Sequence, residues 1–282
     1  MKFTSPKQLK DWIKNKVANE GIPSNTIIQT YMMERFLERI SESTYSDNFI
    51  IKGGFLIASI LGLNSRSTMD IDTTITGLPI DKESIERILY EIVNVEVDDN
   101  VSFKIVDIKS IHDVSDYDDF RVNLEGAFFT IRQNIKIDIT TGDLIIPEEI
   151  DFSYKLMFDE KEILVKAYNL ETILAEKIET IISRNVLNTR ARDYYDIYIL
   201  AKTKWHLIND ELLVDAIVKK FEERDSTVYL KDIARIYEEI SRSTDLKSAW
   251  NNYQKKYEYA KGIDYFDVLT EVLKILELLN KK

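Results

Sequence analysis

Apolar and polar residues recur along this chain with two different periods. In the first 20 residues Leu9 and Ile13 repeat at helical spacing, Ser5 and Pro6 are typical of a helix start, and Gly21 ends the pattern. Helical periodicity continues over residues 25–43, 55–62 and 81–94, while alternation predicts strands over 69–76, 101–108, 121–132 and 135–141. The first part should therefore combine a sheet with helices.

From Leu170 onward the pattern is almost entirely helical, over residues 170–184, 191–203, 209–222, 229–242, 245–259 and 264–280. Pro147 and the polar run 159–162 lie near the change of pattern. We predict an α/β (α+β) fold: a mixed-sheet lobe with flanking helices over residues 1–160 and an all-helical lobe over residues 161–282.

Composition narrows the classes of protein. The 282 residues contain no cysteine, which excludes disulfides and thiolate metal sites. The apolar run 55–63 is too short to span a bilayer, and the first residues lack the apolar core of a secretory signal, so we expect a cytoplasmic protein without a membrane segment. The net charge of −11 argues against general affinity for nucleic acid.

Two short carboxylate patterns suggest a metal site. Alternation along residues 69–76 places Asp70 and Asp72 on one face of a strand, and Asp138 occupies the polar face of the strand 135–141. If the two strands pair, three carboxylates share one sheet face and could hold two Mg²⁺ ions for phosphoryl or nucleotidyl transfer. For an isolated D-x-D pattern a solvated polar face is the more common explanation, and D-x-D is also a weak signature of nucleotide-sugar glycosyltransferases.

A glycine pair precedes these carboxylates. Gly53 and Gly54 open the apolar helix expected over residues 55–62. Glycine allows the backbone to approach phosphate closely, and a helix start offers free N–H groups to an anion. The chain contains no Walker or dinucleotide-binding glycine motif.

One lysine lies on the apolar face of a predicted helix. Lys177 is at i+7 from Leu170 and i+4 from Ile173, where an unpaired charge is costly. A triphosphate would be a suitable partner, but the side chain could also extend to solvent at the edge of the stripe. In the next helix, Arg192 and Asp196 have the i,i+4 spacing of an ordinary surface pair.

Taken together, these stretches resemble the AbiE-family nucleotidyltransferase-like toxins of bacterial toxin–antitoxin and phage abortive-infection systems. The resemblance rests on four motifs in order over residues 25–203: Lys52-Gly53-Gly54, Arg66 to Asp72, Ile137-Asp138, and the pair Leu170 to Lys177 and Arg190 to Tyr198. It implies a polymerase-β-type nucleotidyltransferase fold in the first lobe. The helices after residue 203 carry no motif that we can assign.

The resemblance also implies roles for individual residues. Asp70, Asp72 and Asp138 would bind Mg²⁺ or Mn²⁺, and Lys52, the glycine pair and Lys177 would hold the triphosphate. Arg66, Ser67 and Thr68 in the loop before Asp70 would line the same pocket. Asp193, in the second lobe, would be an essential acidic residue.

We therefore predict a toxin that transfers a nucleotide from an NTP, GTP being one candidate, to RNA, most simply to the 3′ end of tRNA, and so blocks translation in antiviral defence. A cognate antitoxin encoded alongside is the expected partner, direct binding between the two is not required, and the toxin itself should be a monomer. Transfer to a protein acceptor, and a non-catalytic GTP-binding toxin that sequesters a partner, are the alternatives.

Overall fold

The computed structural model describes residues 2–79, 81–111 and 119–279. The chain forms two compact units. The sheet unit consists of Met1–Asp143 and Glu149–Tyr168, and the helical unit consists of Leu144–Glu148 and Asn169–Lys282. The predicted fold class is confirmed. The sheet unit continues past residue 160 because the strand Glu162–Ala167 pairs within the sheet.

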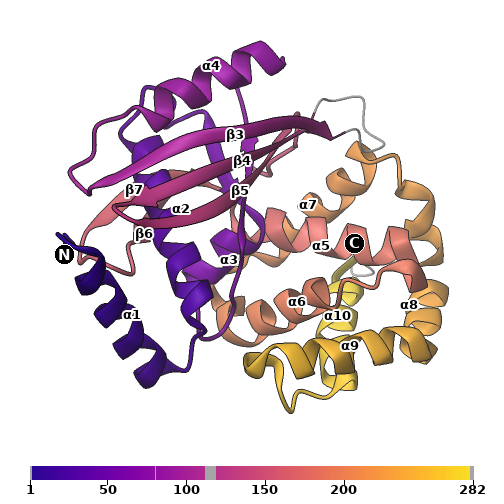
Figure 1. Ribbon diagram of the computed structural model, residues 1–282. Coiled ribbons are helices and arrows are strands. Elements are labelled where there is room, and N and C mark those ends of the chain that lie inside the picture. Colours follow the sequence, from indigo (N-terminus) through magenta and orange to yellow (C-terminus); the bar gives the residue numbers. More distant parts are fainter. Residues whose placement is uncertain (1, 80, 112–118, 280–282) are drawn as a thin grey trace. The chain divides into compact units, whose positions relative to one another are not determined.

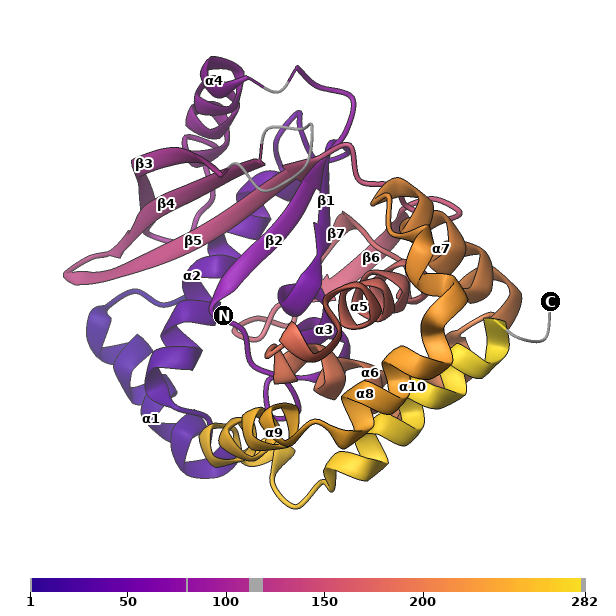
Figure 2. The same cartoon turned by 90° about the vertical axis from the view of Figure 1, so that its right-hand side faces the viewer.

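The described residues form a seven-stranded mixed sheet (Figure 1) in the order β3-β4-β5-β2-β1-β7-β6, with all seven strands labelled in Figure 2. The strands are β1 Phe49–Lys52, β2 Asp70–Ile75, β3 Val101–Ile111, β4 Asp119–Phe128, β5 Ile131–Thr141, β6 Ile150–Lys155 and β7 Glu162–Ala167. β2 runs antiparallel to β1 and parallel to β5, so β2 is paired on both sides. The helices are α1 Pro6–Glu20, α2 Ser24–Ser41, α3 Gly53–Leu61 and α4 Lys82–Val93.

Local signals fix the first helix as predicted. The Ser5 side chain accepts a hydrogen bond from the Gln8 N–H, Pro6 occupies the first turn, and Gly21 ends the helix with φ +70°. In β5 the side chains of Ile135, Ile137 and Ile139 are buried, whereas their neighbours are partly exposed. The alternation predicted for this strand is therefore confirmed, and it leaves a polar face for chemistry.

Two sheet predictions need correction. The stretch 121–132 is not one strand, because β4 ends at Phe128 and β5 begins at Ile131. The intervening Phe129 has φ +50° although neither glycine nor proline marks the turn. In addition, β1, β6 and β7 were not predicted, because β1 is a four-residue, fully buried segment without alternation.

The helical unit contains α5 Leu170–Arg184, α6 Ala191–Lys204, α7 Asp210–Glu223, α8 Ile233–Arg242, α9 Thr244–Lys256 and α10 Tyr265–Leu279. Within it α5 packs on α7, and α10 packs on α6 (Figure 2). The predicted helix over 229–242 starts instead with the 3-10 segment Thr227–Asp232. Tyr194 and Tyr195 are buried in the core of this unit.

Candidate active site

The pairing of β2 with β5 brings the predicted carboxylates together. β2 and β5 lie side by side in Figure 2, and in their parallel register Asp72 lies opposite Asp138 and Asp70 lies opposite Lys136. Asp70, Asp72 and Asp138 therefore share one face of the sheet, because side chains two residues apart on a strand point the same way. The adjacency expected from alternation is present, and it rests on backbone pairing.

Two cations lie on the same face among these carboxylates. The Lys136 Nζ is 2.8 Å from Asp70 Oδ2 and 3.4 Å from Asp138 Oδ2. Arg121, on β4, donates from Nε to Asp138 Oδ1 at 2.8 Å and from its terminal nitrogen to Oδ2 at 2.9 Å. The sequence analysis missed Arg121. The antiparallel register of β4 with β5, which places it opposite Asp138, would have identified it.

Asp72 lies in an electrostatically unfavourable position for a carboxylate. Burial raises its pKa, and the nearby charges of Asp70 and Asp138 raise it further. The charge of Lys52 and the hydrogen bond from the Gly54 N–H act in the opposite direction. The ionised form of Asp72 would therefore be stabilised by an additional positive charge at this face.

The glycine pair forms the start of α3 directly beside Asp72. Gly53 has φ +62°, a conformation that favours glycine, and the Gly54 N–H donates to Asp72 Oδ2 at 3.1 Å. A Cβ atom on Gly53 would lie 2.7 Å from Asp72 Cγ and would overlap Oδ2. Glycine at position 53 is thus required for the turn and for the close approach of the carboxylate.

The loop before β2 packs against this glycine turn. A Cβ atom on Gly54 would lie 2.8 Å from a terminal nitrogen of Arg66 and 3.2 Å from Thr68 Oγ1. The Arg66 and Thr68 side chains are both buried, and Thr68 Oγ1 lies 3.0 Å from Asp70 Oδ1. Arg66 also donates to the Ser67 carbonyl oxygen. Arg66 and Thr68 thus contact the glycine turn, whereas a role for Arg66, Ser67 or Thr68 in nucleotide binding remains a prediction.

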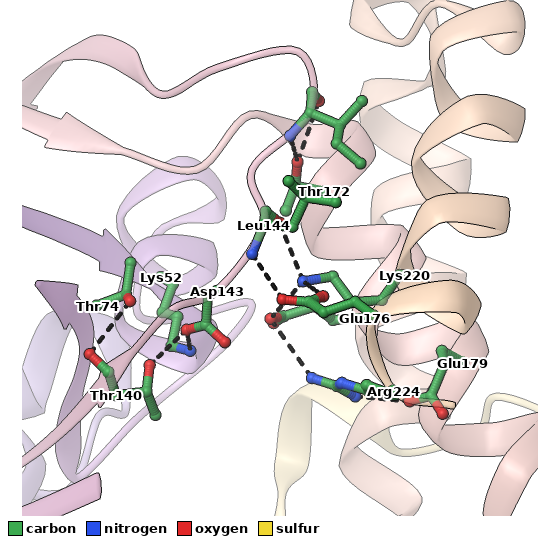
Figure 3. Close-up of polar contacts among 12 residues, drawn as sticks. Lys52, Thr74, Thr140, Asp143, Leu144, Thr172, Glu176, Glu179, Lys220 and Arg224 are labelled. Carbon is green, nitrogen blue, oxygen red and sulfur yellow. Dashed lines mark hydrogen bonds and ion pairs between the residues drawn. The ribbon is translucent and has the colours of Figure 1, made fainter. Parts of the chain in front are cut away.

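Lys52 precedes the glycine pair and is held by a residue that the sequence analysis did not select. Its Nζ lies 2.5 Å from Asp143 Oδ2, and the Thr140 hydroxyl donates to the same carboxylate (Figure 3). Thr74 Oγ1 in turn donates to the Thr140 carbonyl oxygen at 3.2 Å. Lys52 is paired with Asp72 in the β1–β2 register, so a lysine ammonium group lies beside the carboxylate face.

In the helical unit, Lys177 forms ion pairs with two aspartates of α6. Its Nζ is 3.1 Å from Asp193 Oδ1 and 2.8 Å from Asp196 Oδ2. Asp196 is 0% exposed, so the predicted surface pair between Arg192 and Asp196 is wrong. Lys177 provides the charge that a carboxylate buried there requires. Contact between Lys177 and Asp193 follows from the fold, whereas their roles toward a nucleotide remain predictions.

Two glutamates of α5, Glu176 and Glu179, contact cations other than Lys177. Lys220, on α7, is 1% exposed; its Nζ is 3.7 Å from Glu176 Oε1 and donates to the Leu144 carbonyl oxygen at 3.0 Å (Figure 3). Glu179 pairs with Arg224 at 2.6 Å. Glu176 and Glu179 thus contact Lys220 and Arg224, whereas Lys177 pairs with aspartates of α6.

Comparison with known proteins identifies the family. The sequence profile described as nucleotidyl transferase AbiEii toxin, type IV toxin–antitoxin system, matches residues 35–271, which is most of the chain. The chain belongs to this AbiEii toxin family. A search of curated proteins gives no match.

Two solved structures share the fold of this AbiEii-family chain. One is a candidate nucleotidyltransferase from Helicobacter pylori, with TM-score 0.53 and 16% identity over 92% of this chain and 98% of that chain. The other is JHP933 from Helicobacter pylori, with TM-score 0.51 and 16% identity over 92% of this chain and 95% of that chain. At these identities the likeness supports the fold alone.

The residues of this AbiEii-family site partly fit a divalent metal ion. Among residues 2–79, 81–111 and 119–279, no group of three or more histidine or carboxylate side chains is arranged to hold a metal. Lys136 and Arg121 occupy oxygens of Asp70 and Asp138 instead. Asp70 and Asp72 still provide the oxygen donors that Mg²⁺ takes, because this ion is commonly bound by one or two carboxylates together with substrate phosphates and water.

None of the helices formed by the described residues has the length and apolar composition needed to span a bilayer.

Proposed function

We propose that this AbiEii-family toxin is a Mg²⁺-dependent NTP:RNA nucleotidyltransferase that acts in the cytoplasm on the 3′ end of tRNA. The observation that supports this most strongly is the alignment of Asp70, Asp72 and Asp138 on one sheet face beside the Gly53-Gly54 start of α3. Phosphoryl-transfer sites work mainly by positioning and charge neutralisation, and this face supplies carboxylates, backbone N–H groups and lysines together.

In the proposed reaction the RNA 3′ oxygen bonds to the α-phosphorus of the NTP, and the bond from that phosphorus to the bridging oxygen breaks, releasing pyrophosphate. Mg²⁺, held by Asp70 and Asp72, would neutralise phosphate charge. Lys52 and the backbone N–H groups at the start of α3 would bind phosphate oxygens. Asp138 would accept the proton of the attacking hydroxyl group.

The remaining assignments follow from membership of the family. Lys177 would contact the nucleotide phosphates, and Asp193, which pairs with it at 3.1 Å, would be essential for holding it. Type IV toxin–antitoxin systems pair a toxin with an antitoxin, so a cognate antitoxin is the proposed partner.

The test uses purified full-length protein, Mg²⁺, total bacterial RNA and each NTP in turn, radiolabelled at the α-phosphate. Asp70→Ala should abolish labelling because it removes a proposed metal ligand and the partner of Lys136. Asp151→Ala is the matched control: Asp151 lies on β6 of the same unit and forms an exposed pair with Lys166, so the loss of its carboxylate should leave labelling unchanged.

Label on a tRNA-sized band from one NTP, with wild type and Asp151→Ala only, would support the proposal and identify the base. A non-catalytic GTP-binding toxin is the second candidate, because Lys136 and Arg121 already neutralise two of the three carboxylates. GTP binding without label on RNA or protein would favour it, and label on a protein would identify a protein acceptor.

A further inference from the structure

Lys136 occupies the space between two residues expected to bind metal. Its Nζ lies 2.8 Å from Asp70 Oδ2 and 3.4 Å from Asp138 Oδ2, and its side chain is about one third exposed. Lys136 and Asp138 belong to the same strand and face, and Lys136 is paired with Asp70 in the β2–β5 register. The sheet itself therefore directs this ammonium group at the carboxylates.

Arg121 engages Asp138 from the next strand. Its guanidinium group binds both carboxylate oxygens, at 2.8 and 2.9 Å, in the paired geometry that makes arginine–carboxylate contacts strong. Asp138 is thus contacted by Arg121 on β4 and by Lys136 two residues earlier on β5. Both cations belong to regular strands.

Asp72 makes a contact of another kind. Its Oδ2 accepts a hydrogen bond from the backbone N–H of Gly54 at 3.1 Å. The carboxylates therefore divide into Asp138, which is bound by two side-chain cations, and Asp72, which is held by a backbone donor. Asp70 contacts both the Lys136 ammonium group and the Thr68 hydroxyl group.

A two-metal site would place two divalent ions roughly 3.5–4 Å apart among such carboxylates. An ion bound by both Asp70 and Asp138 would need the space that the Lys136 ammonium group fills. At such close contact the positive charges of the ion and the ammonium group would repel strongly. The ammonium group and a second ion therefore exclude each other.

We propose that Lys136 is a positioning residue that takes the place of a second divalent ion, so that this face binds one ion, on Asp70 and Asp72, and not two. The inference rests on the proposed nucleotidyltransferase function and specifies its metal requirement. Arg121 contributes by holding Asp138 in contact with Lys136.

The test is Mn²⁺ binding by the full-length protein without nucleotide, measured from the free-ion signal in electron paramagnetic resonance. Wild type should bind one ion. Lys136→Met keeps much of the side-chain length but removes the charge, so it should bind a second ion or bind the first at least about tenfold more tightly. Lys136→Arg keeps the charge and should behave like wild type. Lys104→Met, which removes an exposed lysine of β3, is the matched control.

Two results would overturn the inference: two ions bound by wild type, or superimposable titrations of wild type and Lys136→Met. If Lys136→Met does not fold, as judged by circular dichroism and thermal melting, the wild-type stoichiometry decides alone. Labelled-NTP transfer is measured on the same preparations. Two ions with active transfer would refute the role of Lys136 and leave the function standing, whereas no ion and no transfer would refute both.

Discussion

The Gly53 position gives the sharpest test of the turn beside Asp72. Replacing Gly53 by alanine has two separable effects. The backbone there has φ +62°, and a left-handed conformation costs an L-residue about 1–2 kcal/mol. The added Cβ would also lie 2.7 Å from Asp72 Cγ and 2.8 Å from Asp72 Cβ, closer than real Cβ atoms approach other atoms, so Asp72 must move.

The size of the movement sets the expected loss of activity. Carbon atoms pack at about 3.5–4.0 Å, so the Asp72 side chain must retreat by roughly 1 Å. A misplacement of about 1 Å in a group that positions the reaction can cost about 10²-fold in rate. Gly53→Ala should therefore reduce nucleotide transfer by roughly that factor, while the free energy of unfolding falls by only about 1–2 kcal/mol.

Gly21→Ala separates the two effects. Gly21 has φ +70° at the end of α1, and a Cβ atom there meets nothing within 4 Å. The Gly21→Ala variant should therefore lose about as much free energy of unfolding as Gly53→Ala in urea denaturation, but keep full transfer activity. If Gly53→Ala and Gly21→Ala show equal activity, the close packing of Gly53 against Asp72 has no functional consequence, and our account of the turn is refuted.

Two further predictions concern buried charges. Glu34, buried on α2, has its pKa raised to about 7 from 4.5, chiefly by burial, so its contribution to stability should be complete below about pH 4.5 and be lost, by about 3 kcal/mol, as the pH rises to about 7. Urea denaturation at about pH 5 and about pH 8 should show this fall in the free energy of unfolding in wild type but not in Glu34→Gln. An equal change between the two pH values in both proteins would contradict the prediction. In the helical unit, Asp196→Ala removes the fully buried partner of Lys177. Because Asp193 still pairs with this lysine, the loss should be about 3 kcal/mol, the lower end of the range for a broken buried pair. Asp215→Ala, which breaks an exposed pair with Lys219, should cost less than about 1 kcal/mol, and similar losses from both variants would contradict the role of burial.

The sequence predicted the elements whose signals are local. The bounds of α5 agree with the prediction, because the regular apolar stripe lies within the helix and the capping residue Asn169, whose side chain accepts a hydrogen bond from the Thr172 N–H, directly precedes it. The strand β6, Ile150–Lys155, was missed although its sequence IDFSYK alternates, because the polar run that follows it suggested a linker. β1 could not be found in this way, since a short buried strand depends on distant partners.

In the candidate site, too, features with a local sequence signal were predicted and features that depend on distant partners were not. Alternation placed Asp70 and Asp72 on one face, and the register then added Asp138. The burial of Asp196 was not predictable from spacing, because an i,i+4 pair with Arg192 is ordinarily a surface feature. Arg121 lies in a strand whose end was misplaced, so its partner could not be counted from the sequence.

The direction of the strands explains why Gly54 and Asp72, 18 positions apart, are in contact. Between Lys52 and Asp70 the chain leaves β1, forms α3 and returns through the Arg66–Thr68 loop. Because β2 runs antiparallel to β1, the end of β1 lies beside the start of β2, and Lys52 is paired with Asp72. A parallel arrangement would place the glycine turn and the aspartates at opposite ends of the sheet. The mixed sheet is therefore the structural requirement for a phosphate-binding turn and carboxylates on one face, and the parallel strand β5 then adds Asp138 with its two cations.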